Sequence, residues 1–270
     1  MKQKQILVAT DFSTRSDRAI RRATLLAKDI GARLTLVHVV DDDQPRRIVQ
    51  AERSATDAIL EEQARTLQKA DGLECDSRLV QGDPFEGIAQ AADDRGADLV
   101  VIGPHRRQAL KDIFIGTTAE RTIRNSSRPV LMTNGIPAGS YQHVLIAVDL
   151  SECSADAVRA LLNLGLERRV AVSVVYVIDS IADGEADASR KLDSFLASIH
   201  FDPIRRIVKP NESLTAATIN KAARECTADL LVVGTHGRTG VADLLLGSVA
   251  QEVLRTATID VLAVPPQRKG

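Results

Sequence analysis

The chain of 270 residues is poor in the residue types that several classes of protein depend on. Tryptophan is absent and aromatic residues make up only 3% of the sequence, so few side chains could stack on the bases of single-stranded nucleic acid. The formal net charge is -1, whereas a nucleic-acid-binding domain is usually basic. Paired arginines recur, but acidic residues are interspersed with them. We therefore expect a solvated surface and no nucleic-acid partner.

Long apolar runs are lacking as well. No apolar stretch approaches the roughly 20 residues that a membrane-spanning helix needs, and the first five residues lead into a strand-like pattern without the apolar core of a signal peptide. We therefore expect a cytoplasmic protein with no membrane partner. Cysteines are few, and Cys75, Cys153 and Cys226 are widely spaced. Their odd number and spacing favour three small buried side chains over a disulfide framework or a metal site.

What the sequence does contain is an alternation of strand-like and helix-like segments. In the first half, apolar runs predict strands at 5–10, 32–40, 74–81, 98–103 and 129–132, with helices between them. Ser13 is a suitable N-cap for the first of these helices, Gly31 would end it, and Pro84 fits the first turn of the third. Strands that alternate with helices in this way predict an α/β fold with a mostly parallel sheet and helices on both faces.

The same pattern occurs a second time. Asp149 follows Asp11 at an offset of 138 residues, and Gly234 follows Gly103 at an offset of 131. The offset between the copies changes only once along the chain, which indicates a tandem duplication. The second copy has lost about seven residues at that point, most simply from its second helix. We predict a first domain at 1–134, a linker at 135–140 and a second domain at 141–270.

The most informative motif lies in the second copy. It reads Gly234-x2-Gly237-x9-Gly247-Ser248, and it follows a buried strand and leads into a helix. Such an arrangement places backbone N–H groups and the positive end of a helix opposite a bound phosphate. Glycine suits these positions because it tolerates positive φ and close approach of the backbone. Neither GxGxxG nor GxxxxGK[ST] occurs, so the common dinucleotide and P-loop motifs are lacking.

With this motif the chain resembles the universal stress protein family in its tandem two-domain form, over essentially residues 3 to 266. The second copy matches the ATP-binding branch, whose signature is G-x2-G-x9-G-[ST]. The resemblance implies two tandem Rossmann-like domains of the adenine nucleotide α-hydrolase type. Each would hold an open parallel sheet of five strands in the order 3-2-1-4-5, with nucleotide at the carboxyl ends of the strands.

The resemblance also implies a set of ATP-binding residues in the second copy. Residues at the ends of the first two strands would contact the adenine and ribose, and those of the glycine motif would line the loop and hold the phosphates. They are Ala147, Asp149, Val177, Val233, Gly234, His236, Gly237, Gly247, Ser248 and Val249.

Several of these residues have simpler explanations. Asp149 could cap the helix after the first strand, and the presence of Asp11 in the first copy weakens Asp149 as evidence for a ligand. Ser248 is a good N-cap whether or not a ligand binds. His236 could simply be a polar loop residue. A role for it as a general base would also require a substrate proton positioned for abstraction. We expect no catalytic residue and no protein-bound metal site.

The first copy departs from the motif. It keeps Gly103, Gly116 and Thr117, but Arg106 stands where the second glycine would be. If that position requires positive φ, a side chain there costs about 1–2 kcal/mol. We therefore expect a closed or degenerate first site. The contrary possibility is that cationic side chains of this loop bind an anion themselves; they are Arg106, Arg107 and Lys111.

The resemblance implies a stress-response binding module that takes ATP, with or without Mg²⁺ on the phosphates. Bound ATP would order the segment between Gly237 and Gly247 and so change the surface offered to a downstream protein. Pairing of such domains implies a homodimer. The alternatives are a nucleotide-independent scaffold and a slow ATPase, for which His236 and Asp243 are the loop groups to test. No P-loop lysine or acidic pair supports efficient phosphoryl transfer.

Overall fold

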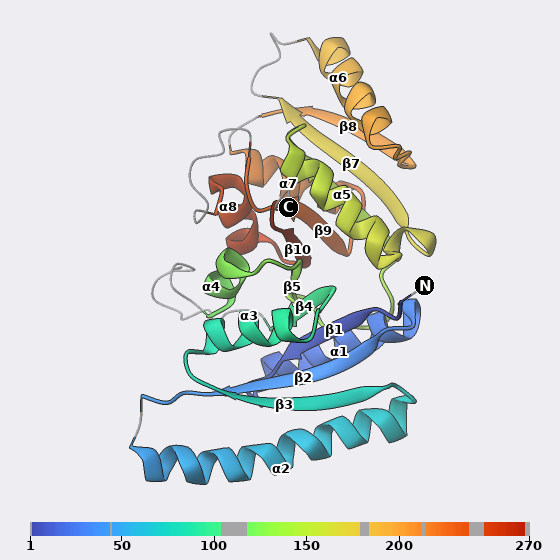
Figure 1. The fold of residues 1–270 in the computed structure, drawn as a ribbon. Helices are drawn as coiled ribbons and strands as arrows, with labels where there is room; N and C mark the ends of the chain where they lie inside the picture. Colours follow the sequence, from blue (N-terminus) through green and yellow to red (C-terminus); the bar gives the residue numbers. More distant parts are fainter. Residues whose placement is uncertain are drawn as a thin grey trace. The chain divides into compact units, whose positions relative to one another are not determined.

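The computed structural model describes residues 2–43, 45–103, 118–178, 184–211, 214–237 and 246–267. The chain divides into two compact units, Met1–Ser140 and Tyr141–Gly270. Each unit is an α/β structure built around parallel strands (Figure 1).

The strands of the first unit pair in the order β3-β2-β1-β4-β5, and every pair is parallel. Along the chain the elements are β1 (Gln5–Ala9), α1 (Thr14–Ile30), β2 (Arg33–Val40), α2 (Arg46–Asp71), β3 (Cys75–Gln81), α3 (Pro84–Asp94), β4 (Leu99–Ile102), α4 (Thr118–Asn125) and β5 (Val130–Met132).

The second unit repeats this arrangement with the order β8-β7-β6-β9-β10, again with parallel pairs. Its elements are β6 (His143–Val148), α5 (Glu152–Leu164), a 3-10 turn (Leu166–Arg168), β7 (Ala171–Ile178), α6 (Glu185–Ser198), β8 (Arg205–Pro210), α7 (Thr215–Glu225), β9 (Leu230–Gly234), α8 (Ser248–Thr256) and β10 (Asp260–Val264). The second helix of the unit, α6, has 14 residues against 26 in α2, so the predicted shortening of this helix is confirmed.

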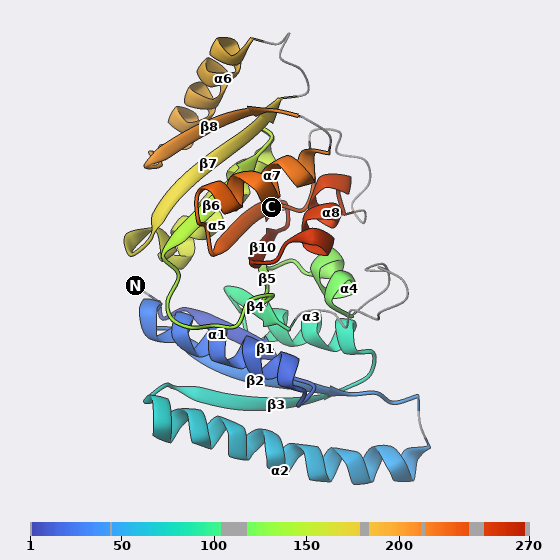
Figure 2. The same ribbon diagram turned by 180° about the vertical axis from the view of Figure 1, so that it is seen from behind.

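The central strand of each unit is buried on both faces. Figures 1 and 2 show α1 and α3 on opposite faces of the first sheet, and α5 and α7 on opposite faces of the second. Leu7 in β1 and Leu145 in β6 are accordingly 0% exposed. Continuous apolar runs in these strands therefore reflect two covered faces, as in parallel sheets generally. The predicted α/β fold is confirmed.

Helix ends follow the local chemistry of the sequence. The side chain of Ser13 accepts from the Ser16 N–H at the start of α1, and Gly31 ends that helix in the left-handed region with φ 67°. Pro84 occupies the first turn of α3. These three predictions are confirmed, because an N-cap oxygen and a left-handed C-cap satisfy the backbone groups that a helix leaves unpaired at its ends.

An aspartate holds the start of the central strand in both units. Asp98 Oδ2 accepts from the Gln5 N–H at 2.9 Å, and Asp229 Oδ1 accepts from the His143 N–H at 3.1 Å. The two aspartates are 131 residues apart in the sequence. The duplication is therefore visible in hydrogen bonds as well as in the apolar pattern.

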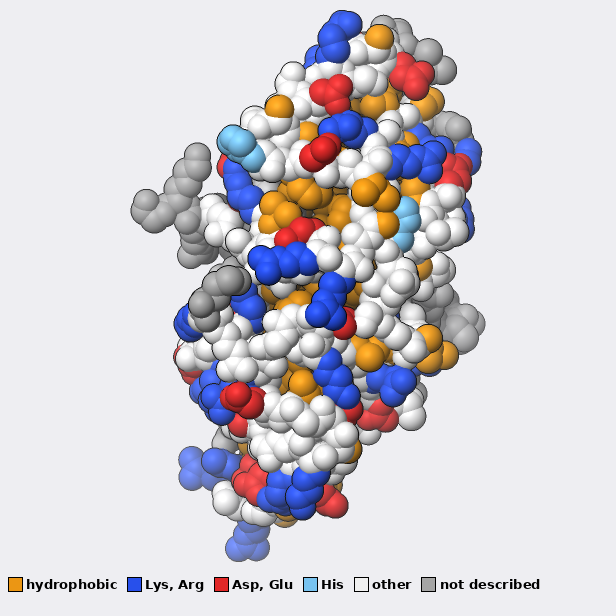
Figure 3. All heavy atoms as spheres, turned by 90° about the vertical axis from the view of Figure 1, so that its right-hand side faces the viewer, with side chains coloured by type: hydrophobic (Ala, Val, Ile, Leu, Met, Phe, Trp, Pro, Cys, Tyr) orange, Lys and Arg blue, Asp and Glu red, His pale blue; other side chains and the backbone are white. Residues whose placement is uncertain are grey.

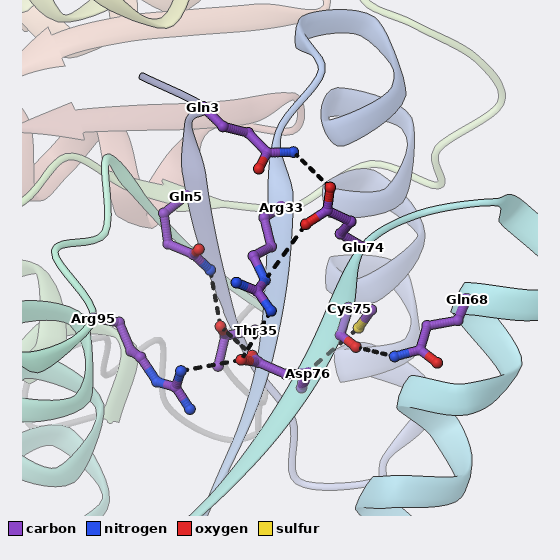
Figure 4. Close-up of polar contacts among 9 residues, drawn as sticks. All are labelled: Gln3, Gln5, Arg33, Thr35, Gln68, Glu74, Cys75, Asp76 and Arg95. Carbon is purple, nitrogen blue, oxygen red and sulfur yellow. Dashed lines mark hydrogen bonds and ion pairs between the residues drawn. The ribbon is translucent and has the colours of Figure 1, made fainter.

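Polar side chains also link the amino ends of the first unit's strands (Figure 4). Gln5 Nε2 donates to Thr35 Oγ1 at 2.8 Å, and Thr35 Oγ1 donates to Asp76 Oδ1 at 2.5 Å. Arg95 Nη1 donates to Asp76 Oδ2 at 3.0 Å. This network links β1, β2 and β3 at their amino ends, on the side of the sheet opposite to their carboxyl ends.

The surface and the cysteines agree with the composition. Figure 3 shows one face, on which Lys and Arg side chains are interspersed with Asp and Glu. Cys75, Cys153 and Cys226 are all buried and unpaired, which confirms the prediction of small buried side chains. Within the described ranges, no helix is both long enough and apolar enough to cross a bilayer.

Candidate functional site

A crevice of about 450 Å³ opens at the carboxyl ends of β6, β7 and β9 in the second unit. The central strand β6 pairs with β7 on one side and with β9 on the other. The chain leaves β6 toward β7 and later returns to β9, which makes this a switch point of the sheet. Crevices at such points are the usual ligand sites of open α/β sheets, and the volume lies in the range of small-molecule pockets.

All ten residues that the sequence predicted for ATP binding line this crevice. They come from four separate segments, at the ends of β6, β7 and β9 and at the start of α8. The structure therefore brings them together, and their binding of ATP stays a prediction.

Asp149 has a structural task at this site. Its Oδ1 accepts from the Ser151 N–H at 3.0 Å and from Ser154 Oγ at 2.6 Å. The N-cap of α5 is Ser151, so the interpretation of Asp149 as the cap itself is wrong. In the first unit Asp11 Oδ1 accepts from the Ser13 N–H at 3.0 Å in the same way. An aspartate here thus supports the turn from strand to helix in both units.

Gly234 is required by close packing. A Cβ on Gly234 would lie 2.9 Å from Cys153 Sγ and 3.1 Å from the Cys153 carbonyl oxygen. A Cβ on Gly103 in the first unit would lie 3.1 Å from the carbonyl oxygen of Arg15, which corresponds to Cys153. The first glycine of the motif therefore lets the end of a strand approach the first turn of a helix. That packing needs glycine with or without a ligand.

Glycine at position 237 leaves room for the side chain beside it. Its φ lies outside the left-handed region, and an added Cβ would lie 3.2 Å from Asp149 Oδ2. Positive φ is therefore not what favours glycine at position 237 of the second unit, and the corresponding Arg106 lies outside the described residues. A side chain at 237 would instead crowd the carboxylate of Asp149, so glycine keeps the space beside that carboxylate open.

The two ends of the glycine motif meet at the start of α8. The Gly247 N–H donates to the Thr235 carbonyl oxygen at 2.8 Å, and a Cβ on Gly247 would lie 3.7 Å from the Gly237 nitrogen. Gly247 is the N-cap of α8, which has no side-chain cap, and Ser248 is its first residue. The expectation of Ser248 as an N-cap is therefore wrong. First-turn N–H groups have no acceptor within their own helix and favour an anion.

His236 carries an unsatisfied buried nitrogen. Its Nδ1 lies 2.9 Å from Thr235 Oγ1, whereas its Nε2 is buried without a hydrogen-bond partner among the described residues. Beneath the same turn, burial raises the pKa of the Cys153 thiol, so this side chain stays neutral at pH 7. The turn at His236 thus has a neutral thiol packed beneath it, and its ring carries a nitrogen without a partner in the described part of the chain.

Sequence reasoning missed the outer wall of the crevice. Ala188 and Lys191 of α6 and Thr215 and Ile219 of α7 also line it. The spacing of Thr215 and Ile219 by four residues places them on one helical face, which is a signal in the sequence. Ala188 and Lys191 are three residues apart and share a face of α6 in the same way, and Lys191 Nζ forms an ion pair with Asp187 at 2.7 Å.

Some predicted groups lie outside the described residues. In the second unit they are Asp243 and the other residues of segment 238–245. This is the segment that bound ATP is expected to order. In the first unit they are Arg106, Arg107, Lys111, Gly116 and Thr117.

Comparisons with known proteins agree on one family. The model of the Universal stress protein family matches residues 3–134 and 140–265. A protein named Universal stress protein from Mycolicibacterium smegmatis is 27% identical, over 97% of this chain and 97% of its own. Universal stress protein E of Escherichia coli strain K12 is 24% identical, over 98% and 95%. The crystal structure of a universal stress protein from Archaeoglobus fulgidus matches with a TM-score of 0.78 at 18% identity, and covers 98% of this chain and 100% of that one. This last likeness concerns the fold alone.

Proposed function

The chain belongs to the universal stress protein family in tandem form, and from that premise we propose that its second unit binds ATP as a regulatory stress-response module. The observation that carries the proposal is the convergence of ten residues from four segments on one crevice of about 450 Å³. The family resemblance selects adenine nucleotide as the ligand class.

The geometry suits the parts of a nucleotide. Ala147 and Val177 at the ends of β6 and β7 would contact the base, and the Asp149 carboxylate would accept from the ribose. Gly237 keeps the adjoining space open, because any Cβ there would lie 3.2 Å from Asp149 Oδ2. The phosphates would lie at Ser248 and the uncapped start of α8, where helix N–H groups and the helix dipole favour negative charge. Mg²⁺ would enter on the phosphates, which needs few protein ligands.

In this proposal the protein senses nucleotide and does not consume it. A ligand shifts a conformational equilibrium only by its differential affinity for the two states. ATP would therefore act by favouring the state of the second unit that a downstream protein recognises. The proposal includes a homodimer of two chains. Light scattering of the purified protein tests the dimer, and a molar mass of one chain would contradict it.

The test is to quantify adenine nucleotide in the purified full chain, as isolated and after addition of ATP with and without Mg²⁺. We expect about one nucleotide per chain, lost in Gly237→Arg, which would place a side chain against the Asp149 carboxylate. Gly139→Arg is the matched control, because Gly139 is exposed and an added Cβ there has no neighbour within 4 Å. This control should keep its nucleotide.

Each other outcome selects an alternative. Two nucleotides per chain would mean that the first unit binds as well, despite Arg106. No binding in any condition would favour the nucleotide-independent scaffold. Release of phosphate over many turnovers would favour an enzyme and reject the sensor.

A further inference from the structure

The first unit contains a groove of about 420 Å³, and helices α1 and α2 supply all of its lining residues. Its volume lies within the range of small-molecule pockets. Ile20 and Thr24 line it from α1 and are four residues apart, as are Ile59 and Gln63, which line it from α2. Each helix therefore presents one face to the groove. None of the lining residues belongs to the crevice of the second unit.

Part of the lining is apolar. Ile20, Ile59 and Leu67 line the groove, and Ile59 is 48% exposed. A ligand with an apolar part would remove this exposed surface from water, and the free energy gained is roughly proportional to the apolar area that is covered. The groove therefore favours a ligand that is at least partly apolar.

Two charged side chains of the groove already have partners in the first unit. Asp71 Oδ1 accepts from Lys28 Nζ at 2.7 Å, so a lysine neutralises this carboxylate. Arg21 Nε donates to the Pro137 carbonyl oxygen at 2.9 Å, which restrains the guanidinium. The remaining charged side chains of the lining therefore decide which ligand charge the groove prefers.

These remaining side chains are both acidic. Asp17 of α1 and Glu62 of α2 are exposed and line the groove. Within the described part of the chain, neither carboxylate takes part in a hydrogen bond or an ion pair. An ionised carboxylate can only accept hydrogen bonds. The groove thus offers negative charge from both helices, which favours a cation that carries N–H donors.

The lining contains a further acceptor without a partner. Gln63 Oε1 is buried and has no hydrogen-bond partner among the described residues, and Gln63 lines the same groove as Glu62. Buried side-chain oxygens of this kind are usually hydrogen-bonded, because an unpaired one has lost its water without compensation. An N–H group of a ligand would supply the missing donor.

We propose that this groove binds a small amphiphilic amine, in which an apolar chain or ring carries a protonated nitrogen. The apolar part would cover Ile59, and the ammonium group would lie beside Asp17 and Glu62. An ammonium group has three N–H donors, which is enough for both carboxylates and for Gln63 Oε1. The site belongs to the first unit and is independent of the proposed binding of nucleotide.

The experiment titrates the full chain with hexylamine at pH 7 and follows the amide signals by NMR. Two probes with the same apolar chain, 1-hexanol and hexanoate, are neutral and negatively charged. We expect hexylamine to shift the signals of residues 17–24 and 59–71. It should bind about two- to tenfold more tightly than 1-hexanol, because each attraction between exposed charges is modest. Hexanoate should bind more weakly than 1-hexanol.

Four variants assign the contributions. Asp17→Asn and Glu62→Gln remove one charge each, and each should weaken hexylamine binding about two- to fivefold without changing the affinity for 1-hexanol. Asp57→Asn is the matched control, since Asp57 is an exposed aspartate of α2 that does not line the groove. It should leave both affinities unchanged. Ile59→Ala should weaken hexylamine and 1-hexanol alike, by about threefold.

Three results would overturn the proposal. They are signals of 17–24 and 59–71 that do not respond to hexylamine, equal affinities for hexylamine and 1-hexanol, and a loss of affinity in Asp57→Asn as large as in the two groove variants. The last result would reveal a general effect of protein charge. The amide spectrum of each variant also shows whether it is folded, so loss of binding through unfolding is recognised.

Discussion

At the scale of single residues, the first glycine of each repeat is a packing residue. Gly103 and Gly234 each let a strand end approach the second residue of a helix, Arg15 in α1 and Cys153 in α5. The contact is with backbone in both units, so neighbouring side chains cannot relieve it by rotation. Extra methyl groups in such well-packed places cost about 1–3 kcal/mol.

We therefore predict that Gly234→Ala and Gly103→Ala each lower the free energy of unfolding by about 1–3 kcal/mol. Only Gly234→Ala should also reduce bound nucleotide, because it displaces the strand end that leads to His236 and Gly237. Chemical denaturation and nucleotide content measure the two effects. Gly139→Ala is the control and should be neutral, since its Cβ meets nothing within 4 Å. An unchanged denaturation midpoint in Gly234→Ala would contradict the packing argument.

At the scale of elements, corresponding helices of the two units begin differently. Asp83 caps α3, and its Oδ1 accepts from the Phe85 N–H at 3.0 Å. The corresponding position before α7 is Leu214, which forms no side-chain cap and is 61% exposed. Both residues have an extended backbone, so the geometry for a cap is present at Leu214 and only the side-chain oxygen is lacking.

This difference predicts opposite effects of two substitutions. Asp83→Ala should destabilise the protein by about 1 kcal/mol, and Leu214→Asn should stabilise it by about 0.5–1 kcal/mol, because an N-cap oxygen satisfies a first-turn N–H. Asp83→Asn is the control, since it keeps the capping oxygen and weakens the exposed ion pair to Arg121, which contributes little. Urea denaturation compares the variants. A destabilised Leu214→Asn would show that this helix start does not accept a cap.

Local chemistry explains how much of the fold could be predicted from the sequence. Ser13, Gly31 and Pro84 act through their immediate neighbours, so their positions predicted the helix ends correctly. The role of Ser248 was wrong because Gly247 already occupies the cap position. The preference for glycine at position 237 depends on the Asp149 carboxylate, which is distant in sequence and close only in the folded chain.

The candidate site likewise contains residues that the sequence predicts and residues that it does not. Its glycines can be predicted because the motif keeps a fixed spacing, and Asp149 is predicted through the family resemblance. Lys191 and Thr235 were not, because the first reaches the crevice from a helix without a motif and the second acts through a hydrogen bond to His236. A hydrogen bond between side chains, such as that of Thr235, leaves no pattern in a single sequence.

At the scale of the whole molecule, the two units share a strand order and the packing of the first glycine, whereas the complete glycine motif occurs in the second unit only. Binding of ATP should therefore protect the backbone amides of the second unit only from hydrogen exchange. We predict that saturating ATP slows amide hydrogen exchange at 147–150, 233–237 and 246–250, by up to about a hundredfold when the ligand exceeds its Kd a hundredfold. The corresponding described residues of the first unit, 9–12 and 102–103, should exchange at unchanged rates. Mass spectrometry of peptides resolves these segments, and Gly237→Arg, the control, should abolish the effect. Equal protection of both units would contradict a single site and would mean that the first unit binds nucleotide without the second glycine.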